Sequence, residues 1–296
     1  MKTNIPLLAC AAMAALITSA SATVTMDWVT VGNANNDPSS TGYGAVDYEY
    51  KIGKYEVTNA QYGEFLNAKG QTNSGGIYNT GMAGYGITQT GSSGSFSYTV
   101  NGTLANRPVV YVSWFDAARF ANWMMNGQGS SDMESGAYTL AGATSGIITA
   151  NIGAQVYLPS ENEWHKAAYY NAANASHSPF PNGQNTISTA DMNYIYSVGS
   201  STDVGTYISA PSAYGTFDQG GNVWEWTDSV IGSSRGISGG AWNSDAINLS
   251  IIYHYYIVPT SESYDLGFRI ASVPEPTSMF MTIFAGGMML IRRKRI

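Results

Sequence analysis

Cysteine is almost absent from this chain of 296 residues, because Cys10 is the only one. It lies within the first 22 residues, which have the layout of a secretory signal. Lys2 gives a positive start, an apolar run follows over residues 5–17, and Ala20-Ser21-Ala22 offers small residues for cleavage. The sequence predicts a signal peptide at residues 1–22, and a mature protein without disulfides or thiolate ligands.

Charged side chains are also scarce, at 11% of the residues, against about 25% in ordinary soluble domains. Lys2 and four residues of the basic C-terminal end account for five of the 13 cations, and Glu275 for one of the 20 acids. The body between the two ends therefore has 8 cations against 19 acids. This balance argues against a nucleic-acid partner and is compatible with cation binding.

Several common catalytic patterns are missing. The three histidines, His165, His177 and His254, are scattered along the chain and lack the spacing of a metal site. The sequence has no phosphate-binding glycine loop and no nucleophile elbow. Nucleotide binding and serine hydrolysis are therefore not indicated.

The most informative stretch present is residues 218–226, where two carboxylates flank a double glycine. Gly220-Gly221 allows a tight turn, and the following residues predict a strand with Val223 and Glu225 on one face. Asp218, Glu225 and nearby carbonyls could supply oxygens to a hard cation such as calcium. In the alternative interpretation, Asp218 caps the turn, and Glu225 lies on the surface or pairs with an arginine. Spacing alone favours this alternative.

Two capping boxes, at Thr58 and Ser160, predict helix starts, and so does Ser113 as an N-cap with Asp116 three residues later, where a carboxylate favours the helix dipole. The capping residues are Thr58, Ser113 and Ser160, and the helices are expected to end near residues 68, 127 and 170. Glu161 and Glu163 are interpreted as first-turn acids that favour the helix dipole, not as an acid–base pair. Strands are expected at residues 28–31, 48–55, 137–140 and 251–258, with a hairpin around 95–100.

Six blocks in this order resemble the sulfatase-modifying-factor family, whose best-known member is the formylglycine-generating enzyme. They occupy residues 54–62, 108–117, 158–164, 214–226, 239–242 and 267–269, the last two being Gly239-Gly240-Ala241-Trp242 and Gly267-Phe268-Arg269. The resemblance covers roughly residues 27–272. It implies one α+β domain, at residues 23–272, with a loop-rich C-type-lectin-like fold, few helices and short antiparallel strands.

The resemblance also implies a structural calcium ion. Transferred residue by residue, the family's second calcium site falls on the side chains of Asp218 and Glu225 and the carbonyls of Gly221 and Val223. Asn193 matches the asparagine of the first site, but the acid that should follow it is not evident, so that site is expected to be weak or absent.

The catalytic residues of the family are not matched. Its formylglycine-generating members bind copper through two cysteines, and those places fall near Ser244 and Leu249, so the sequence argues against copper. Its iron-dependent sulfoxide synthases have an extra helical-bundle domain that is missing here. No catalytic residue is therefore predicted. The alternative is a diverged oxidoreductase of the family with a relocated active site.

A third group of similar proteins, the retroelement-diversified lectin-like proteins, uses this fold for binding. They share the Gly-Gly-x-Trp and Gly-Phe-Arg segments, and the tract between them is rich in tyrosine here. Candidate ligand-binding residues are Trp242, Tyr253, Tyr255 and Tyr256; equally, these tyrosines could pack within a strand. The predicted function is that of a non-catalytic, calcium-stabilised surface domain that binds extracellular polysaccharide or another surface protein.

The C-terminal end, residues 273–296, resembles the PEP-CTERM sorting signal of Gram-negative bacteria. Pro274-Glu275-Pro276 precedes an apolar run over residues 279–291 and a basic end at 292–295. The resemblance implies an exosortase-type partner, transient anchoring in the inner membrane, cleavage of the tail, and delivery to the cell surface or extracellular matrix. A plain transmembrane tail anchor is the alternative.

Overall fold

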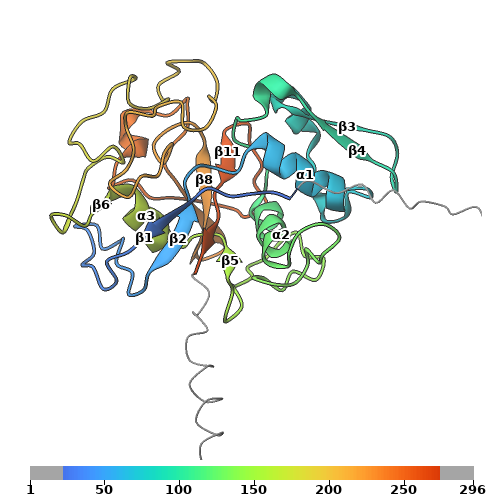
Figure 1. Ribbon diagram of the computed structural model, residues 1–296, viewed down its shortest axis with the longest axis horizontal. Coiled ribbons are helices and arrows are strands. Elements are labelled where there is room, and N and C mark those ends of the chain that lie inside the picture. The colour runs from blue at the N-terminus through green and yellow to red at the C-terminus, as the bar shows by residue number, and fades with distance from the viewer. Residues whose placement is uncertain (1–22, 274–296) are drawn as a thin grey trace, which may run out of the picture.

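Capping boxes set the starts of the three α-helices in the computed structural model, which describes residues 23–273 (Figure 1). The helices are α1 (Asn59–Lys69), α2 (Trp114–Met125) and α3 (Glu161–Tyr169). At each start, the cap hydroxyl accepts from the third helical N–H, and that residue's side chain accepts from the cap N–H. All three predicted starts are confirmed, and α2 ends two residues before the predicted Gly127.

The first sheet contains both ends of the described chain. It consists of β1 (Trp28–Val31), β2 (Tyr50–Gly53), β12 (Ala271–Ser272) and β5 (Val156–Tyr157), in that order. All its pairs are antiparallel, and Ala271 lies between Ile52 and Tyr157. The strand predicted at 28–31 is confirmed, and the one predicted at 48–55 is confirmed over residues 50–53. The last strand of the described residues occupies an interior position of the sheet.

The second sheet contains the predicted strand of the glycine stretch. Its order is β10 (Tyr255–Ile257), β9 (Ser234–Ser238), β8 (Trp224–Ile231) and β11 (Leu266–Phe268). β8 pairs antiparallel with β9 and parallel with β11, so that Leu266 lies opposite Trp224. The predicted strand is confirmed and is longer than expected.

Short elements fill the connections. Two ribbons are β3 (Ile87–Thr90) with β4 (Ser97–Val100), and β6 (Tyr170–Asn171) with β7 (Ser176–His177). Short 3-10 helices lie at Ser74–Gly76, Thr80–Tyr85, Gly102–Leu104 and Ala246–Leu249. The hairpin predicted around residues 95–100 is confirmed as β3–β4.

One predicted strand, at 137–140, was wrong, and another, at 251–258, was too long. Residues 137–140 form only an isolated bridge, between Tyr138 and Ala150. The side chain of Asn122 accepts from the Tyr138 N–H at 2.8 Å and donates to its carbonyl at 2.9 Å, so it takes the place of a strand partner. The strand predicted at 251–258 shortens to β10.

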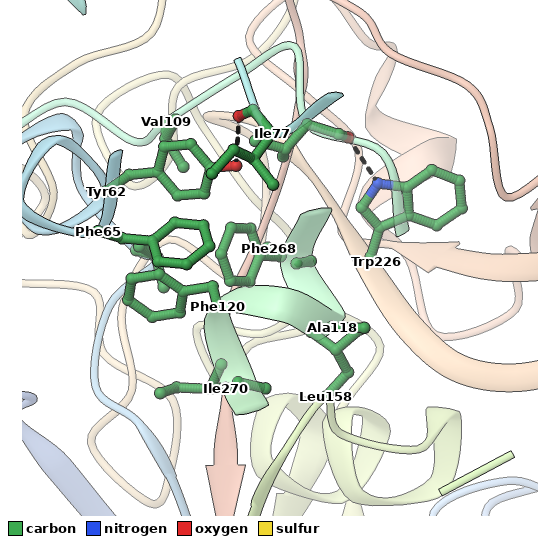
Figure 2. Close-up of a cluster of buried hydrophobic side chains, with 14 of the residues drawn as sticks. Tyr62, Phe65, Ile77, Val109, Ala118, Phe120, Leu158, Trp226, Phe268 and Ile270 are labelled. Carbon is green, nitrogen blue, oxygen red and sulfur yellow. Dashed lines mark hydrogen bonds between the residues drawn. The ribbon is translucent and has the colours of Figure 1, made fainter. Parts of the chain in front are cut away.

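Aromatic rings from three elements form the centre of the main core (Figure 2). Tyr62 and Phe65 of α1 meet Phe120 of α2, and Phe268 of β11 packs against Phe120 with ring centroids 5.5 Å apart. Trp226 donates its indole N–H to the Val112 carbonyl at 2.9 Å. Each such ring pair stabilises by about 0.5–1.5 kcal/mol beyond its buried area, so this core fixes the second sheet against α1 and α2.

Candidate functional site

The glycine stretch is a tight loop tied to two neighbouring loops. Asp218, Gly221 and Asn222 all have positive φ, and Asn222 donates its N–H to the Asn193 carbonyl at 2.9 Å. A side chain at Gly221 would place its Cβ 2.1 Å from that same carbonyl oxygen. Only glycine fits there, which explains why the double glycine precedes β8.

Glu225 is fully buried and paired with Arg269. The guanidinium donates to both carboxylate oxygens, at 2.5 and 2.6 Å, and the indole N–H of Trp164 donates to Oε2 at 2.7 Å. Arg269 also donates to the carbonyls of Gly53 and Phe217. Of the two alternatives for Glu225 outside a metal site, the structure shows pairing with an arginine.

Two further carboxylates lie near this ion pair. Burial, and then the charges of Asp218 and Glu225, raise the pKa of Glu56 well above its usual range. Glu56 Oε1 accepts from Asn222 at 3.0 Å, whereas Oε2 is buried without a partner. Burial raises the pKa of Asp218 to about 6, against the opposing effects of the Gly205 N–H and of Arg269. The positive charge of Arg269 therefore acts on three carboxylates, those of Glu56, Asp218 and Glu225.

This arrangement fits the predicted calcium ion only in part. Asp218 accepts one hydrogen bond, from Gly205 at 2.5 Å, and Gly221 and Val223 can offer their carbonyls, but Glu225 is committed to Arg269 and Trp164. Residues 23–273 contain no group of three or more His, Cys, Asp or Glu side chains arranged to hold a metal. The predicted site has only two carboxylates, so this absence does not decide it, and the site stays a prediction.

Asn193 lies beside the same loop, and its polar groups hydrogen-bond to the backbone of neighbouring segments. Its side chain donates to the Ser200 carbonyl at 2.8 Å, and its own carbonyl accepts from Asn222. Asn193 thus joins two loops, and its role in a first calcium site remains untested.

The four predicted ligand-binding residues separate into three places. The rings of Tyr253, Tyr255 and Trp224 lie within 5.9–6.2 Å of one another, and we call these three the tyrosine cluster. Trp242 instead contacts Tyr196 and Tyr264. Tyr256 donates its hydroxyl to Glu161 at 2.8 Å. The structure therefore brings Tyr253 and Tyr255 together but does not join Tyr256 to them.

The three histidines meet, although their sequence positions gave no sign of it. The ring of His165 lies 5.9 Å from that of His177 and 6.0 Å from that of His254. His165 and His177 each contact a backbone carbonyl through Nε2, and Nδ1 is buried without a partner. Gly44 lies against His165 and His177, with no room for a side chain. We call His165, His177 and His254 the histidine cluster.

Glu161 completes the histidine cluster at the start of α3. Its carboxylate contacts His254 Nδ1 at 2.6 Å and accepts from Tyr256. Tyr43 stacks on His254 with ring centroids 4.1 Å apart. Glu161 thus does more than favour the helix dipole. Glu163 accepts from the N–H and hydroxyl of Ser160, as predicted, and also from Tyr157. Only a three-dimensional arrangement could reveal this cluster, because its three histidines come from three separate segments.

The two positions that align with the family's cysteines have structural roles. Leu249 is fully buried, in an apolar cluster with Met192 and Tyr194. Ser244 Oγ accepts from the Ala241 N–H at 2.9 Å.

The predicted signal peptide and the tail after residue 273 lie outside the described residues. Within residues 23–273, none of the helices is long and apolar enough to cross a membrane. The signal peptide, the PEP-CTERM signal and its apolar segment therefore stay predictions.

Comparisons with known proteins agree with this architecture. The profile of the sulfatase-modifying factor enzyme 1-like domain matches residues 22–273. Hercynine oxygenases of Mycobacterium tuberculosis and Mycolicibacterium smegmatis are each 28% identical over 191 residues, which are 62% of this chain. The chain spans only 38% and 37% of the length of these two relatives.

Two solved structures share the fold. Treponema denticola variable protein 1 has a TM-score of 0.60 and 21% identity, over 86% of this chain and 97% of that protein. The crystal structure of CarF has the same TM-score and identity, over 85% and 99%. The predicted loop-rich, C-type-lectin-like α+β fold is therefore confirmed.

Proposed function

Because this chain belongs to the sulfatase-modifying factor enzyme 1-like domain family, we propose that it uses the family fold for binding. The protein is exported to the surface of a Gram-negative bacterium, where its partner is an extracellular polysaccharide or another surface protein. The tyrosine cluster supports this proposal best. Its rings come from β8 (Trp224), from β10 (Tyr255) and from the segment just before β10 (Tyr253), and Tyr255 is 45% exposed.

Tyrosine and tryptophan suit such a role, because they give large rigid contact areas at a small loss of side-chain entropy. The sugar ring of a polysaccharide has an apolar C–H face that can pack on an aromatic ring, and hydroxyls that hydrogen-bond to a tyrosine. The scarcity of charge in the sequence is compatible with a partner recognised by rings and hydroxyls. Calcium, if bound near Asp218, would stabilise the loop before β8 and take no part in contact with the partner.

Catalysis is the second candidate, and one observation favours it. The similarity to hercynine oxygenases extends over 62% of the chain, so a diverged oxidoreductase with a relocated active site remains the alternative. The positions aligned with the family's cysteines are Ser244 and Leu249, neither of which has a thiolate to bind a soft metal such as copper. Metal analysis of the purified protein separates the two candidates: stoichiometric copper or iron together with oxygen consumption would favour the enzyme.

Binding is tested by affinity electrophoresis of the purified protein in gels that contain the exopolysaccharide of its own organism. We expect retardation, and we expect Tyr255→Ala to weaken it about tenfold, the effect of losing roughly 1.4 kcal/mol of contact. Ile152→Ala is the matched control, because Ile152 is fully exposed and outside the cluster. Migration unaffected by the polysaccharide, with no surface protein captured either, would contradict the proposal.

A further inference from the structure

Five aromatic residues from five separate segments form a continuous row, and we call them the aromatic row. In spatial order they are Tyr196, Trp242, Tyr264, Tyr85 and Tyr111, with successive ring centroids 5.5, 5.9, 6.4 and 5.4 Å apart. Each ring contacts only the next one along, so the row is a line and not a compact cluster. None of the five is fully buried, and Tyr196 and Tyr264 are 63% and 38% exposed.

The backbone is strained where it presents this row. Ile195 and Tyr196 have φ of 51° and 59°, and Tyr111 has φ of 59°. A β-branched residue in this region is a genuine outlier, and such strain persists only where surrounding contacts enforce it. Here Ile195 donates to the Ser244 carbonyl at 2.9 Å, and Tyr196 to the Trp242 carbonyl at 2.8 Å. The backbone is therefore held in a strained conformation that keeps Tyr196 exposed beside Trp242.

Three polar side chains, those of Asn243, Ser263 and Asp265, lie beside the aromatic row. Asn243 Nδ2 lies 3.3 Å from the Tyr264 hydroxyl and donates to Asp265 at 3.0 Å. Ser263 donates its hydroxyl to the other oxygen of Asp265 at 2.5 Å. Hydroxyls, an amide and a carboxylate beside an aromatic ring match a ligand that has both an apolar face and a rim of hydroxyl groups.

Charge narrows the choice of ligand. Among residues 23–273, none of the lysines or arginines hydrogen-bonds to a ring of the row or lies over one, whereas Asp265 is fixed beside it. An anionic polymer would meet this carboxylate and gain no contact with a cation at the rings, which is unfavourable. An uncharged polymer meets no such penalty.

From these observations we infer that the aromatic row is a binding surface for an extended stretch of an uncharged, linear polysaccharide, with its sugar rings packed against the exposed parts of the row. This surface is additional to the tyrosine cluster. The inference rests on the proposed function only in taking a polysaccharide as the partner.

The test is affinity electrophoresis of the purified protein with two neutral polymers, hydroxyethyl cellulose and dextran, and one anionic polymer, alginate. We expect at least one neutral polymer to retard the protein and alginate to leave its mobility unchanged. Tyr196→Ala and Tyr264→Ala should each weaken the retardation about tenfold, since each removes one stacking ring worth roughly 1.4 kcal/mol. Ile152→Ala is the control, because Ile152 is fully exposed and outside both the row and the tyrosine cluster, and it should leave neutral-polymer binding intact.

The outcomes separate this inference from the proposed function. Neutral-polymer binding that depends on Tyr196 and Tyr264 supports the row, even if the organism's own exopolysaccharide is not bound. The row is overturned if neither neutral polymer binds, if alginate alone binds, or if binding survives both substitutions and is lost in Tyr255→Ala. In the last case polysaccharide binding, and with it the proposed function, still stands. Far-ultraviolet circular dichroism of each variant shows whether a loss of binding reflects a loss of fold.

Discussion

Arg269 is the residue on which the buried acids depend. It is the fully buried partner of Glu225, and its charge also opposes the rise in the pKa of Glu56 and Asp218. Removing one partner of a buried ion pair leaves an uncompensated charge, which costs about 3–5 kcal/mol. We therefore expect Arg269→Met to lower the free energy of unfolding by about that amount at pH 7, as measured by urea denaturation.

Two comparisons make this prediction specific. Lys51→Met removes a cation that belongs to none of the ion pairs among residues 23–273, so it should change stability little. The double variant Arg269→Met, Glu225→Gln should recover part of the loss. A loss below 1 kcal/mol in the single variant would show that Glu225 does not depend on this arginine.

Asp218 provides the test for calcium. Its ionised form is unfavourable in the folded protein, as the raised pKa of about 6 indicates, and a cation would relieve this. A ligand that binds only the folded state at one hundred times its Kd stabilises by about 2.7 kcal/mol. We expect calcium to raise the melting temperature relative to a chelator, and Asp218→Asn to lose that difference.

Asp132→Ala is the control for this experiment, because Asp132 is exposed and outside the loop. It should keep the full calcium-dependent difference. If the wild-type protein melts at the same temperature in calcium and in chelator, Asp218 is a turn residue whose carboxylate is held by the Gly205 N–H alone.

At the scale of elements, the histidine cluster connects α3 to the loop that contains Tyr43 and Gly44. Burial lowers the pKa of His165 to about 3 and lowers that of His177. The unfolded chain therefore binds more protons than the folded protein once the pH falls below about 6.5. The resulting stability is present at neutral pH and is lost on acidification, at about 1.4 kcal/mol per pH unit for the buried His165.

We expect His165→Gln to remove this histidine contribution, so that its urea midpoint rises relative to that of the wild-type protein when the pH is lowered from 7.5 to 5.0. The difference between the two pH values is the readout, because the substitution can alter stability equally at both. Four carboxylates have the opposite sign, because burial raises the pKa values of Glu56, Asp116, Asp218 and Asp228, to about 7 for Asp116 and Asp228. Their contribution favours the folded state at lower pH and is lost as the pH rises through the folded values, so wild-type stability rises on acidification wherever they outweigh the histidines. A difference between His165→Gln and the wild-type protein that is the same at both pH values would contradict the histidine contribution.

The elements also show what a sequence can predict. All three helix starts were correct, because a helix cap is a local pattern complete within four residues. The strand at 137–140 was wrong because the side chain of Asn122, in the preceding helix, hydrogen-bonds to the backbone of Tyr138. Pairing of Glu225 with an arginine was foreseen only as one alternative, without the identity of the arginine. The histidine cluster and the aromatic row were missed, because side chains from distant segments have no shared sequence pattern.

At the scale of the whole molecule, the fate of the C-terminal end distinguishes sorting from simple anchoring. The match to the family domain ends at residue 273, and Pro274-Glu275-Pro276 follows in the sequence. If the tail is a sorting signal, mass spectrometry of protein released from the cell surface should find a new C-terminus close to these three residues. Surface protein that retains Arg292 to Arg295 would instead support a plain tail anchor.

The interior position of β12 has a consequence for how the protein is made. β12 lies between β2 and β5, so the first sheet lacks an inner strand until residues 271–272 have been synthesised. Arg269, the partner of the buried Glu225, also arrives only then. The first sheet and the buried ion pair therefore cannot form until nearly all of the chain has been made, and such long-range closure is slow. A chain that cannot close during most of its synthesis is compatible with the proposed export, which needs an unfolded chain to enter a secretion channel.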